Sequence, residues 1–498
     1  MRVQPDRSWT VGGPDCGPDE GLHETLARLA RRRPGAAALV SGSRTVTYAE
    51  LDRAADAWAA RLTAAGAGPG RVVPILLPRC TELVTALLAV LKTGAAYALL
   101  DPDWPAERID DLLSVLAPPV VVDRPVGPFP PSRGFTPATV RAADPCCVFL
   151  TSGTTGTPKA VLTPHRAIAR LFGPHGFARF TATSVMPLAA PGPWDAFALE
   201  LWSVLLGGGT SVLVTEPYLS AHALRDGVAR HGVDTAWLTS SLFNLAVDED
   251  PDAFTGLRQV MIGGERLCPD HVARFLRRHP TIVLLNGYGP VESTVFATTH
   301  RITAADCARP DGIPLGRPVP GTRVLVLAGD RMCAVGEPGE ICLAGSGLAI
   351  GYLGDPERTA ERFGTVLLDG APVRVYRTGD IGVWGADGLL RFRGRADRQV
   401  KVRGHRVEPA EVEAQIRRLL PEVADCRVLS RRDPAGLTDE LVAFCVPAAP
   451  AGAPDRLAKS LLPHHRPAAV VGIPAFPVTD RGKLNEPALL ALAHPTPP

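Results

Sequence analysis

The sequence predicts an α/β protein with a large N-terminal domain and a smaller α+β C-terminal domain. From residue 146 to about 300, apolar strand-like runs alternate with helical stretches, which is typical of parallel sheets in α/β layers. We therefore expect two such sheet layers in the large domain. After about residue 310, short strands with turn signals indicate a small antiparallel or β-barrel-like unit. From Arg395 onward, strands mix with one clear helix, so we place the domains at 1–395 and 396–498.

The elements follow from local patterns along the chain. A helix-like pattern at residues 22–30 precedes a short strand that leads into a second amphipathic helix, in the segment 45–51. A helix ends at Gly94 and is followed by a strand at 96–100. Further strands are expected at 146–150, 211–214, 235–238, 281–285, 323–327, 340–344 and 389–393, and the C-terminal helix is expected at Pro409–Leu420.

Bulk composition limits the possible partners. The 53 basic and 51 acidic residues give a net charge of +2, which favours neither nucleic acid nor an anionic membrane. The ten cysteines include no Cys-x-x-Cys pair, so metal spacing is absent and buried free thiols are expected. The most apolar window, 83–100, is interrupted by Lys92 and Gly94, and the N-terminus lacks the apolar core of a signal peptide. These features predict a cytoplasmic enzyme without a membrane span.

The most informative segment is Thr-Ser-Gly-Thr-Thr-Gly-Thr-Pro-Lys at residues 151–159. Hydroxyl groups and backbone N–H groups of a glycine-rich turn can bind phosphate oxygens. The segment follows an apolar strand and precedes a helical stretch from about His165, which suits a polyphosphate-binding loop. It differs from the common P-loop, because Pro158 precedes the lysine and Ala160 follows it. Taken alone, the pattern also fits an ordinary Ser/Thr/Gly loop.

Six further segments occur with this loop in a fixed order, at residues 47–51, 91–97, 286–292, 376–380, 394–401 and 481–483. Together they resemble the acyl-adenylate-forming superfamily, most closely the adenylation domains of nonribosomal peptide synthetases. The resemblance runs from about residue 20 to 490 and strongly favours the phosphate-loop interpretation. It implies ATP and Mg²⁺ as cofactors.

The resemblance also implies roles for individual residues. The β- and γ-phosphates of ATP would be held by the loop residues Thr151, Ser152, Gly153, Thr154, Thr155, Gly156 and Lys159. Glu292 would be the Mg²⁺ ligand, a hard carboxylate for a hard ion. The ribose hydroxyls would be bound by Asp380 and Arg395, and the adenine would be lined by Gly264, Glu265, Asn286, Gly287 and Tyr288.

Lys483, in a Gly-Lys context near the C-terminus, resembles the mobile lysine of this family. It would bridge the substrate carboxylate and the α-phosphate, a task that suits a flexible point charge. The small domain would then rotate about a hinge at Asp397 and admit a thiol for the second step.

Asp195 falls where these enzymes place the aspartate that pairs with the substrate α-ammonium group. Such a carboxylate selects amino acids over fatty acids; the alternative is a helix N-cap. The other pocket positions carried over bear no charge or strong polar group: Ala196, Leu199, Trp237, Met261, Gly263, Gly287, Val295 and Phe296. This pocket predicts an aliphatic α-amino acid, with valine as the first choice.

Two departures from the family pattern are present. Val291 stands where a threonine is usual, with Ser293 as a possible substitute hydroxyl, and Ala160 replaces a glycine. The 15 residues after Lys483 contain no serine to carry a phosphopantetheine arm, so we expect a stand-alone ligase that charges a separate carrier protein. Some relatives need an MbtH-like helper protein. The alternatives are an acyl-CoA synthetase for a non-amino acid, and a nucleotide-binding protein without turnover.

Overall fold

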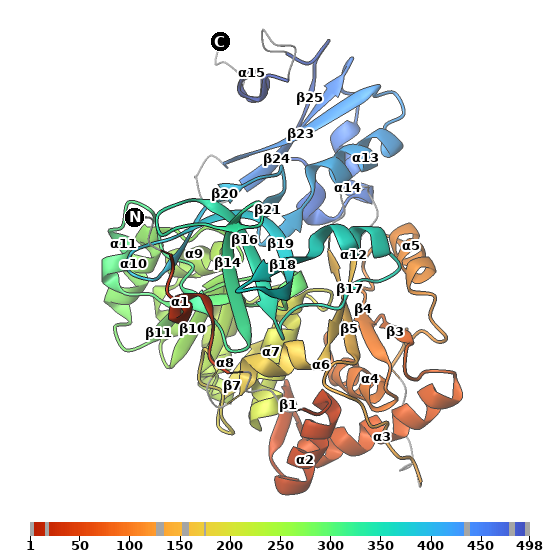
Figure 1. Cartoon of the computed structure of the whole chain (residues 1–498). Coiled ribbons are helices and arrows are strands. Elements are labelled where there is room, and N and C mark those ends of the chain that lie inside the picture. The colour runs from red at the N-terminus through yellow and green to blue at the C-terminus, as the bar shows by residue number, and fades with distance from the viewer. Residues whose placement is uncertain are drawn as a thin grey trace. The chain divides into compact units, whose positions relative to one another are not determined.

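The computed structural model describes residues 4–14, 19–125, 134–151, 159–173, 176–432, 439–477 and 484–493. Figure 1 labels the helices and strands. The chain divides into two compact units, the first comprising Met1–Leu150 and Ala160–Ala396 and the second comprising Thr151–Lys159 and Asp397–Pro498. The main division therefore falls one residue after the boundary placed from the sequence. The functional roles of the two domains remain a prediction.

One five-stranded sheet of the first unit carries the segment that precedes the candidate phosphate loop. Its order is β17-β6-β5-β4-β3, and β3, β4 and β5 run parallel. β4 is buried along its whole length, as expected for a parallel sheet with covered faces. The elements are β3 (Val72–Ile75), α4 (Thr81–Lys92), β4 (Ala96–Leu99), α5 (Ala106–Leu116), β5 (Pro145–Thr151), β6 (Lys159–Pro164) and β17 (Gly351–Tyr352).

The elements predicted in this region are present, and β3, α5 and β17 were not predicted. The helix expected to end at Gly94 is α4, and the strand expected at 96–100 is β4. β6, which lies between the candidate phosphate loop and the helix at His165, was not predicted from the sequence. That helix, α6 (His165–Ala169), is short and continues as a 3₁₀ turn, η1 (Arg170–Phe172).

A second five-stranded sheet has the order β13-β12-β11-β10-β9. β9, β10 and β11 run parallel in register, so Met261 lies between Trp237 and Leu285, and Gly263 lies beside Gly287. Because the carboxyl ends of parallel strands share one edge, this sheet gathers residues from three segments there. The elements are β9 (Thr235–Thr239), α9 (Ser240–Glu249), β10 (Gln259–Gly263), α10 (Pro269–Arg278), β11 (Val283–Tyr288), β12 (Thr298–Arg301) and β13 (Arg317–Pro318).

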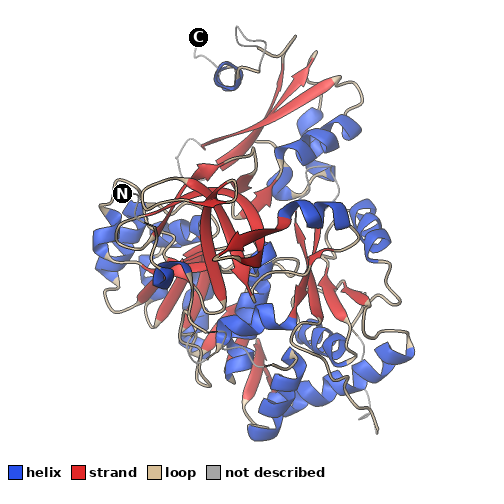
Figure 2. Ribbon diagram, viewed as in Figure 1, coloured by secondary structure: helices blue, strands red, loops and turns tan. Residues whose placement is uncertain are grey.

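A four-stranded sheet of order β2-β1-β8-β7 also belongs to the first unit; β1 and β7 run parallel to β8, and β2 runs antiparallel to β1. The predicted strand-to-helix segment at 45–51 is confirmed: the Thr47 hydroxyl and the Glu50 carboxylate form a capping box at the start of the helix. The elements are α2 (Leu22–Arg32), β1 (Ala37–Ser41), β2 (Arg44–Thr47), α3 (Tyr48–Ala64), β7 (Val185–Leu188), α7 (Asp195–Gly207), β8 (Thr210–Leu213) and α8 (Ala221–His231). Helices flank the sheets (Figure 2).

The predicted antiparallel unit after residue 310 is a six-stranded sheet. It has the order β15-β14-β16-β19-β18, and β20 pairs with β19. All neighbouring strands in this sheet pair antiparallel. The strands are β14 (Thr322–Ala328), β15 (Arg331–Met332), β16 (Gly339–Gly345), β18 (Phe363–Leu368), β19 (Ala371–Trp384) and β20 (Leu390–Arg395), and α12 (Pro356–Arg362) precedes β18.

The second unit is the expected small α+β fold. β23 (Asp425–Arg432), β24 (Asp439–Val446) and β25 (Ala469–Gly472) form a mixed sheet. The helix predicted at 409–420 is α13 (Pro409–Leu419), and a hairpin of β21 (Val400–Val402) and β22 (His405–Val407) precedes it. Val412 and Ile416 of α13 are fully buried in this unit's own apolar core. In the part of the chain that the structure describes, no helix is both long and apolar enough to span a bilayer.

Candidate active site

The predicted adenine-lining residues meet at the carboxyl end of the second parallel sheet. Gly263 ends β10 and pairs with Gly287 of β11. A Cβ atom built on Gly263 would lie 2.2 Å from the Gly287 carbonyl oxygen, so only glycine permits this close approach. Gly264 follows with φ at +83°, a conformation that L side chains rarely adopt. Glu265 and Tyr288 continue from these two strand ends, so the two predicted segments lie at the same sheet edge.

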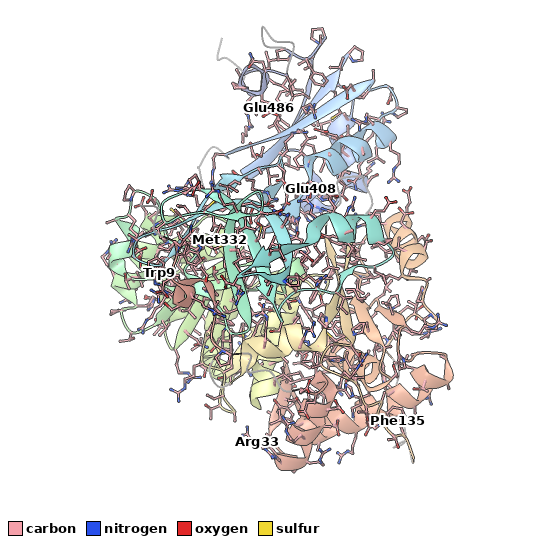
Figure 3. The ribbon with its side chains drawn as sticks, in the orientation of Figure 1. Trp9, Arg33, Phe135, Met332, Glu408 and Glu486 are labelled. Atoms are coloured by element: carbon pink, nitrogen blue, oxygen red, sulfur yellow. The ribbon has the colours of Figure 1, made fainter. Side chains whose placement is uncertain are left out.

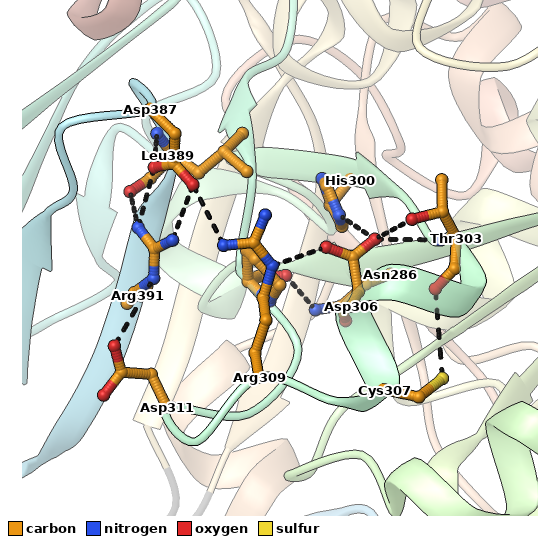
Figure 4. Close-up of polar contacts among 11 residues, drawn as sticks. Asn286, His300, Thr303, Asp306, Cys307, Arg309, Asp311, Asp387, Leu389 and Arg391 are labelled. Carbon is orange, nitrogen blue, oxygen red and sulfur yellow. Dashed lines mark hydrogen bonds and ion pairs between the residues drawn. The ribbon is translucent and has the colours of Figure 1, made fainter.

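Asn286 on β11 is anchored at the base of this edge. Its Nδ2 donates to the Pro314 carbonyl oxygen at 2.7 Å. Charged side chains reinforce the neighbouring loops: Arg309 donates to Asp306 at 2.9 Å and to Asp387 at 3.1 Å (Figure 4). The network orders the edge of the sheet around Asn286.

The two predicted ribose-binding residues are direct neighbours. Asp380 of β19 pairs in register with Arg395 of β20, and their side chains form an ion pair. The Tyr288 hydroxyl donates to the other Asp380 oxygen at 2.5 Å. Burial, reinforced by the Asp380 charge, raises the pKa of Tyr288 well above its ordinary value, so Tyr288 remains a hydrogen-bond donor at neutral pH. The tyrosine thereby links the predicted adenine-lining residues to the predicted ribose-binding pair.

Glu292 is fully buried and lies in a short 3₁₀ turn, η3 (Val291–Ser293). Its Oε1 accepts a hydrogen bond from the Tyr352 hydroxyl at 2.7 Å. The adjacent Ser293 Oγ is buried and has no hydrogen-bond partner among the described residues, so an oxygen-rich ligand could satisfy it. A carboxylate with a neighbouring hydroxyl fits Mg²⁺, which binds through one or two carboxylates together with substrate phosphates. The described residues include no cluster of three or more metal-binding side chains, and a Mg²⁺ site of this kind does not need one.

Part of the predicted phosphate and catalytic set lies outside the described residues. This applies to Ser152, Gly153, Thr154, Thr155 and Gly156, and to Lys483. Thr151 ends β5, and its buried Oγ1 has no hydrogen-bond partner among the described residues. Lys159 begins β6, and its Nζ lies 3.0 Å from Glu408 Oε1. Both residues belong to the second unit, and this partner was not predicted from the sequence. Asp397, the predicted hinge, accepts a hydrogen bond from the Gln399 N–H at 3.2 Å.

Asp195 is the first residue of α7. The N-cap is Trp194, whose side chain makes no capping bond, so Asp195 does not take the alternative role of N-cap. Its Oδ2 accepts a hydrogen bond at 2.8 Å from the backbone N–H of Val295, 100 residues away in sequence. The structure therefore brings together the predicted ammonium-binding carboxylate and a predicted pocket residue.

The other predicted pocket side chains belong to one apolar cluster of the first unit. They are all buried: Ala196, Leu199, Trp237, Met261, Val295 and Phe296. A Cβ atom on Gly287 would lie 2.2 Å from Cε1 of Phe296, so the Phe296 ring occupies the space beside this glycine. The Trp237 Nε1–H is buried without a hydrogen-bond partner among the described residues. In the predicted pocket, Phe296 would limit the space beside Gly287, and the Trp237 N–H would be an available hydrogen-bond donor.

Some residues that shape this region were not predicted from the sequence. Tyr352 contacts Glu292, and Arg170 contacts the turn that carries Val295. The only available signal for Arg170 was a cationic residue inside the apolar run from His165 to Phe172. Their partners lie 60 and 123 residues away, so local patterns could not identify them.

Comparisons with known proteins show which family this chain resembles. The profile of a family described as AMP-binding enzyme matches residues 26–134 and 123–353. Isonitrile lipopeptide synthase of Mycobacterium tuberculosis is 37% identical over 94% of this chain and 19% of that protein. The chain therefore spans only a small part of the curated relatives that it matches.

Two solved structures extend the comparison. Holo-PA1221, an NRPS protein containing adenylation and PCP domains bound to a vinylsulfonamide inhibitor, has a TM-score of 0.86 at 35% identity, covering 96% of this chain and 84% of that one. Klebsiella oxytoca NpsA in complex with 3-hydroxyanthranilyl-AMSN has a TM-score of 0.71 at 26% identity, covering 95% of this chain and 100% of that one.

Proposed function

Because the chain belongs to the AMP-binding enzyme family, as an adenylation domain of the nonribosomal peptide synthetase type, we propose that it activates an aliphatic α-amino acid, valine first. It would form an aminoacyl-AMP from ATP and then acylate the phosphopantetheine thiol of a separate carrier protein. A natural-product pathway in the cytoplasm, where ATP is available, is part of this proposal. The main support for an amino-acid substrate is the Asp195 carboxylate, which accepts a hydrogen bond from the Val295 N–H beside a buried apolar cluster.

The nucleotide would occupy the sheet edge of the first unit. Adenine would lie against Gly264, Glu265 and the Asn286–Tyr288 segment, and the ribose hydroxyls would bond to Asp380 and Arg395. The loop at 151–159, including Lys159, would hold the β- and γ-phosphates. Glu292 would hold Mg²⁺, which when bound neutralises charge on the triphosphate.

The proposed chemistry needs one attacking group and one leaving group in each step. A carboxylate oxygen of the amino acid forms a bond to the α-phosphorus, the bond from that phosphorus to the β-bridging oxygen breaks, and pyrophosphate leaves. Lys483 would bridge the carboxylate and the α-phosphate. After the small domain moves about Asp397, the carrier thiolate bonds to the acyl carbon and AMP leaves.

The side-chain pocket sets the expected substrate class. Its apolar lining disfavours charged side chains, because a buried charge without a partner is strongly unfavourable. Homologues that differ by one methylene would be separated by only about 1–3 kcal/mol. Threonine, which is nearly isosteric with valine, belongs in the test set because the Trp237 N–H could bond its hydroxyl.

ATP–pyrophosphate exchange over the common amino acids, together with aryl and fatty acids, tests the proposal. The assay is run with and without a co-expressed MbtH-like helper. We expect exchange that depends on valine or a similar amino acid, and at least a roughly 100-fold lower kcat/KM for that acid in Asp195→Asn. The exposed Asp103→Asn is the matched control and should behave as wild type.

Two outcomes would redirect the proposal. Preference for a charged amino acid would overturn the pocket interpretation. Equal activation of an aryl or fatty acid by wild type and Asp195→Asn would favour activation of a non-amino acid, as in an acyl-CoA synthetase. The solved complex of NpsA with 3-hydroxyanthranilyl-AMSN is the reason for including aryl acids. No exchange with any acid would favour a nucleotide-binding protein without turnover.

A further inference from the structure

The turn at residues 293–296, which carries two predicted pocket residues, has an unusual backbone. Thr294 and Val295 have φ values of +53° and +64°. Both residues are β-branched, and each such conformation costs about 1–3 kcal/mol and persists only where the surrounding structure imposes it. The turn must therefore be held by contacts outside itself.

Arg170 supplies such contacts. It is fully buried, and its Nη2 lies 2.8 Å from the Ser293 carbonyl oxygen and 3.0 Å from that of Phe296. The guanidinium therefore donates to both ends of the turn. Hydrogen bonds from a charged donor are stronger than neutral ones, and a planar guanidinium can reach two acceptors at once.

Gly347 closes the arrangement from another side. A Cβ atom built on it would lie 2.1 Å from Arg170 Nη2 and 2.4 Å from Cζ, so the glycine backbone lies directly against the guanidinium. The Gly347 carbonyl oxygen also accepts a hydrogen bond from Thr294 Oγ1 at 3.1 Å. The arginine has little room to move.

Both functional groups of the predicted pocket depend on this turn. The Val295 N–H donates to Asp195, and the Phe296 ring lies beside Gly287. Phe177, seven residues after Arg170, packs edge-on against Phe296 with ring centroids 5.3 Å apart. A shift of the turn would change both the position of the carboxylate and the width of the pocket.

We propose that Arg170 is a positioning residue for amino-acid recognition: it holds the strained 293–296 turn so that Asp195 and Phe296 are correctly spaced for the substrate. The contacts described above support the way in which Arg170 holds the turn. The effect on substrate recognition rests on the proposed function. Replacing Arg170 should therefore weaken binding of the amino acid without weakening binding of ATP.

The test compares Arg170→Lys and Gly347→Ala with two controls. Gly347→Ala leaves the arginine in the chain but displaces its guanidinium, so it remains informative if Arg170→Lys does not fold. The glycine control is Gly35→Ala, because nothing lies within 4 Å of a Cβ there. The arginine control is Arg33→Lys: Arg33 (Figure 3) also donates to two backbone carbonyls, at 3.2 Å to Ala182 and 2.7 Å to Gly208, and neither belongs to the pocket.

We expect KM for the amino acid to rise on the order of tenfold or more in Arg170→Lys and Gly347→Ala, with KM for ATP within about twofold of wild type. Amide hydrogen exchange of a peptide covering residues 291–297 should become faster in these two variants and stay unchanged in the controls. Unchanged amino-acid KM in Gly347→Ala, or equal increases in both KM values, would overturn the proposal.

The hydrogen-exchange measurement separates this proposal from the proposed function. If wild type activates no amino acid, the proposed function fails, and the exchange rate at 291–297 decides whether Arg170 holds the turn. Unchanged exchange in both variants refutes the positioning role regardless of activity. Faster exchange confined to this peptide supports it.

Discussion

Glu200 on α7 should make the stability of the first unit depend on pH between about 4.5 and 7. Its side chain is 1% exposed, and Oε2 accepts hydrogen bonds from the Ala189 and Ala190 N–H groups at 2.6 and 2.7 Å. Burial raises the pKa of this carboxyl group from 4.5 to about 7, although the two backbone N–H groups and Arg79 oppose that rise. The protonated form is therefore favoured in the folded protein more than in the unfolded chain.

The sign follows from proton binding. Above pH 4.5 the unfolded chain loses this proton while the folded protein keeps it until about pH 7, so the free energy of unfolding falls as pH rises through this window. At about 1.36 kcal/mol for each pH unit, the loss is about 3 kcal/mol. Glu200→Gln cannot titrate, so this part of the pH dependence should disappear.

Denaturant unfolding at a series of pH values from about 4.5 to 8 measures the effect. As pH rises through this window, the wild type should lose about 3 kcal/mol of unfolding free energy that Glu200→Gln does not lose. Glu50→Gln is the control, because hydrogen bonds from Thr47 lower the pKa of Glu50 and move its titration below this window. Parallel curves for Glu200→Gln and wild type would refute the reasoning.

The proposed site gives three further predictions. Asp380→Asn should raise KM for ATP on the order of tenfold, because it removes the charged acceptor shared by Tyr288 and Arg395; initial rates of exchange at varied ATP measure this. Lys483→Ala should lower kcat for exchange at least about 100-fold while ATP binding measured by calorimetry persists, and near-normal turnover would contradict the bridging role. Phe296→Ala should widen the pocket beside Gly287 and shift kcat/KM at least about tenfold from valine toward leucine or phenylalanine; an unchanged order of substrates would contradict the assigned position of the ring.

The sequence predicted those parts of the structure that depend on local patterns. Apolar alternation identified the strands that became β9, β11 and β14, and helical periodicity located α13 to within one residue of its end. Each of these strands and helices is encoded in a short local segment of the chain. The family resemblance named Asp380 and Arg395 as ribose-binding residues, and the structure places them opposite each other in an antiparallel register.

Other features could not be predicted, because their causes lie far apart in sequence. Nothing near Val295 indicates a positive φ, since valine normally avoids that region and the contacts that impose it come from other segments. The contact between Tyr352 and Glu292 joins residues 60 positions apart. The strand β6 was missed because its six residues follow one proline and end with another, and both residues suggest a loop rather than a strand.

Pocket-lining residues alone therefore give an incomplete account of selectivity. The lining predicted from the motifs specifies its chemistry: one carboxylate and a set of apolar side chains. Its dimensions depend on where the 293–296 turn lies, and that position is determined by Arg170 and Gly347, which lie outside the predicted lining. Since a single methylene changes binding by only about 1–3 kcal/mol, a small displacement of the turn is sufficient to change which aliphatic acid is preferred. Two chains with identical lining residues but different residues at positions 170 and 347 should therefore differ in substrate choice.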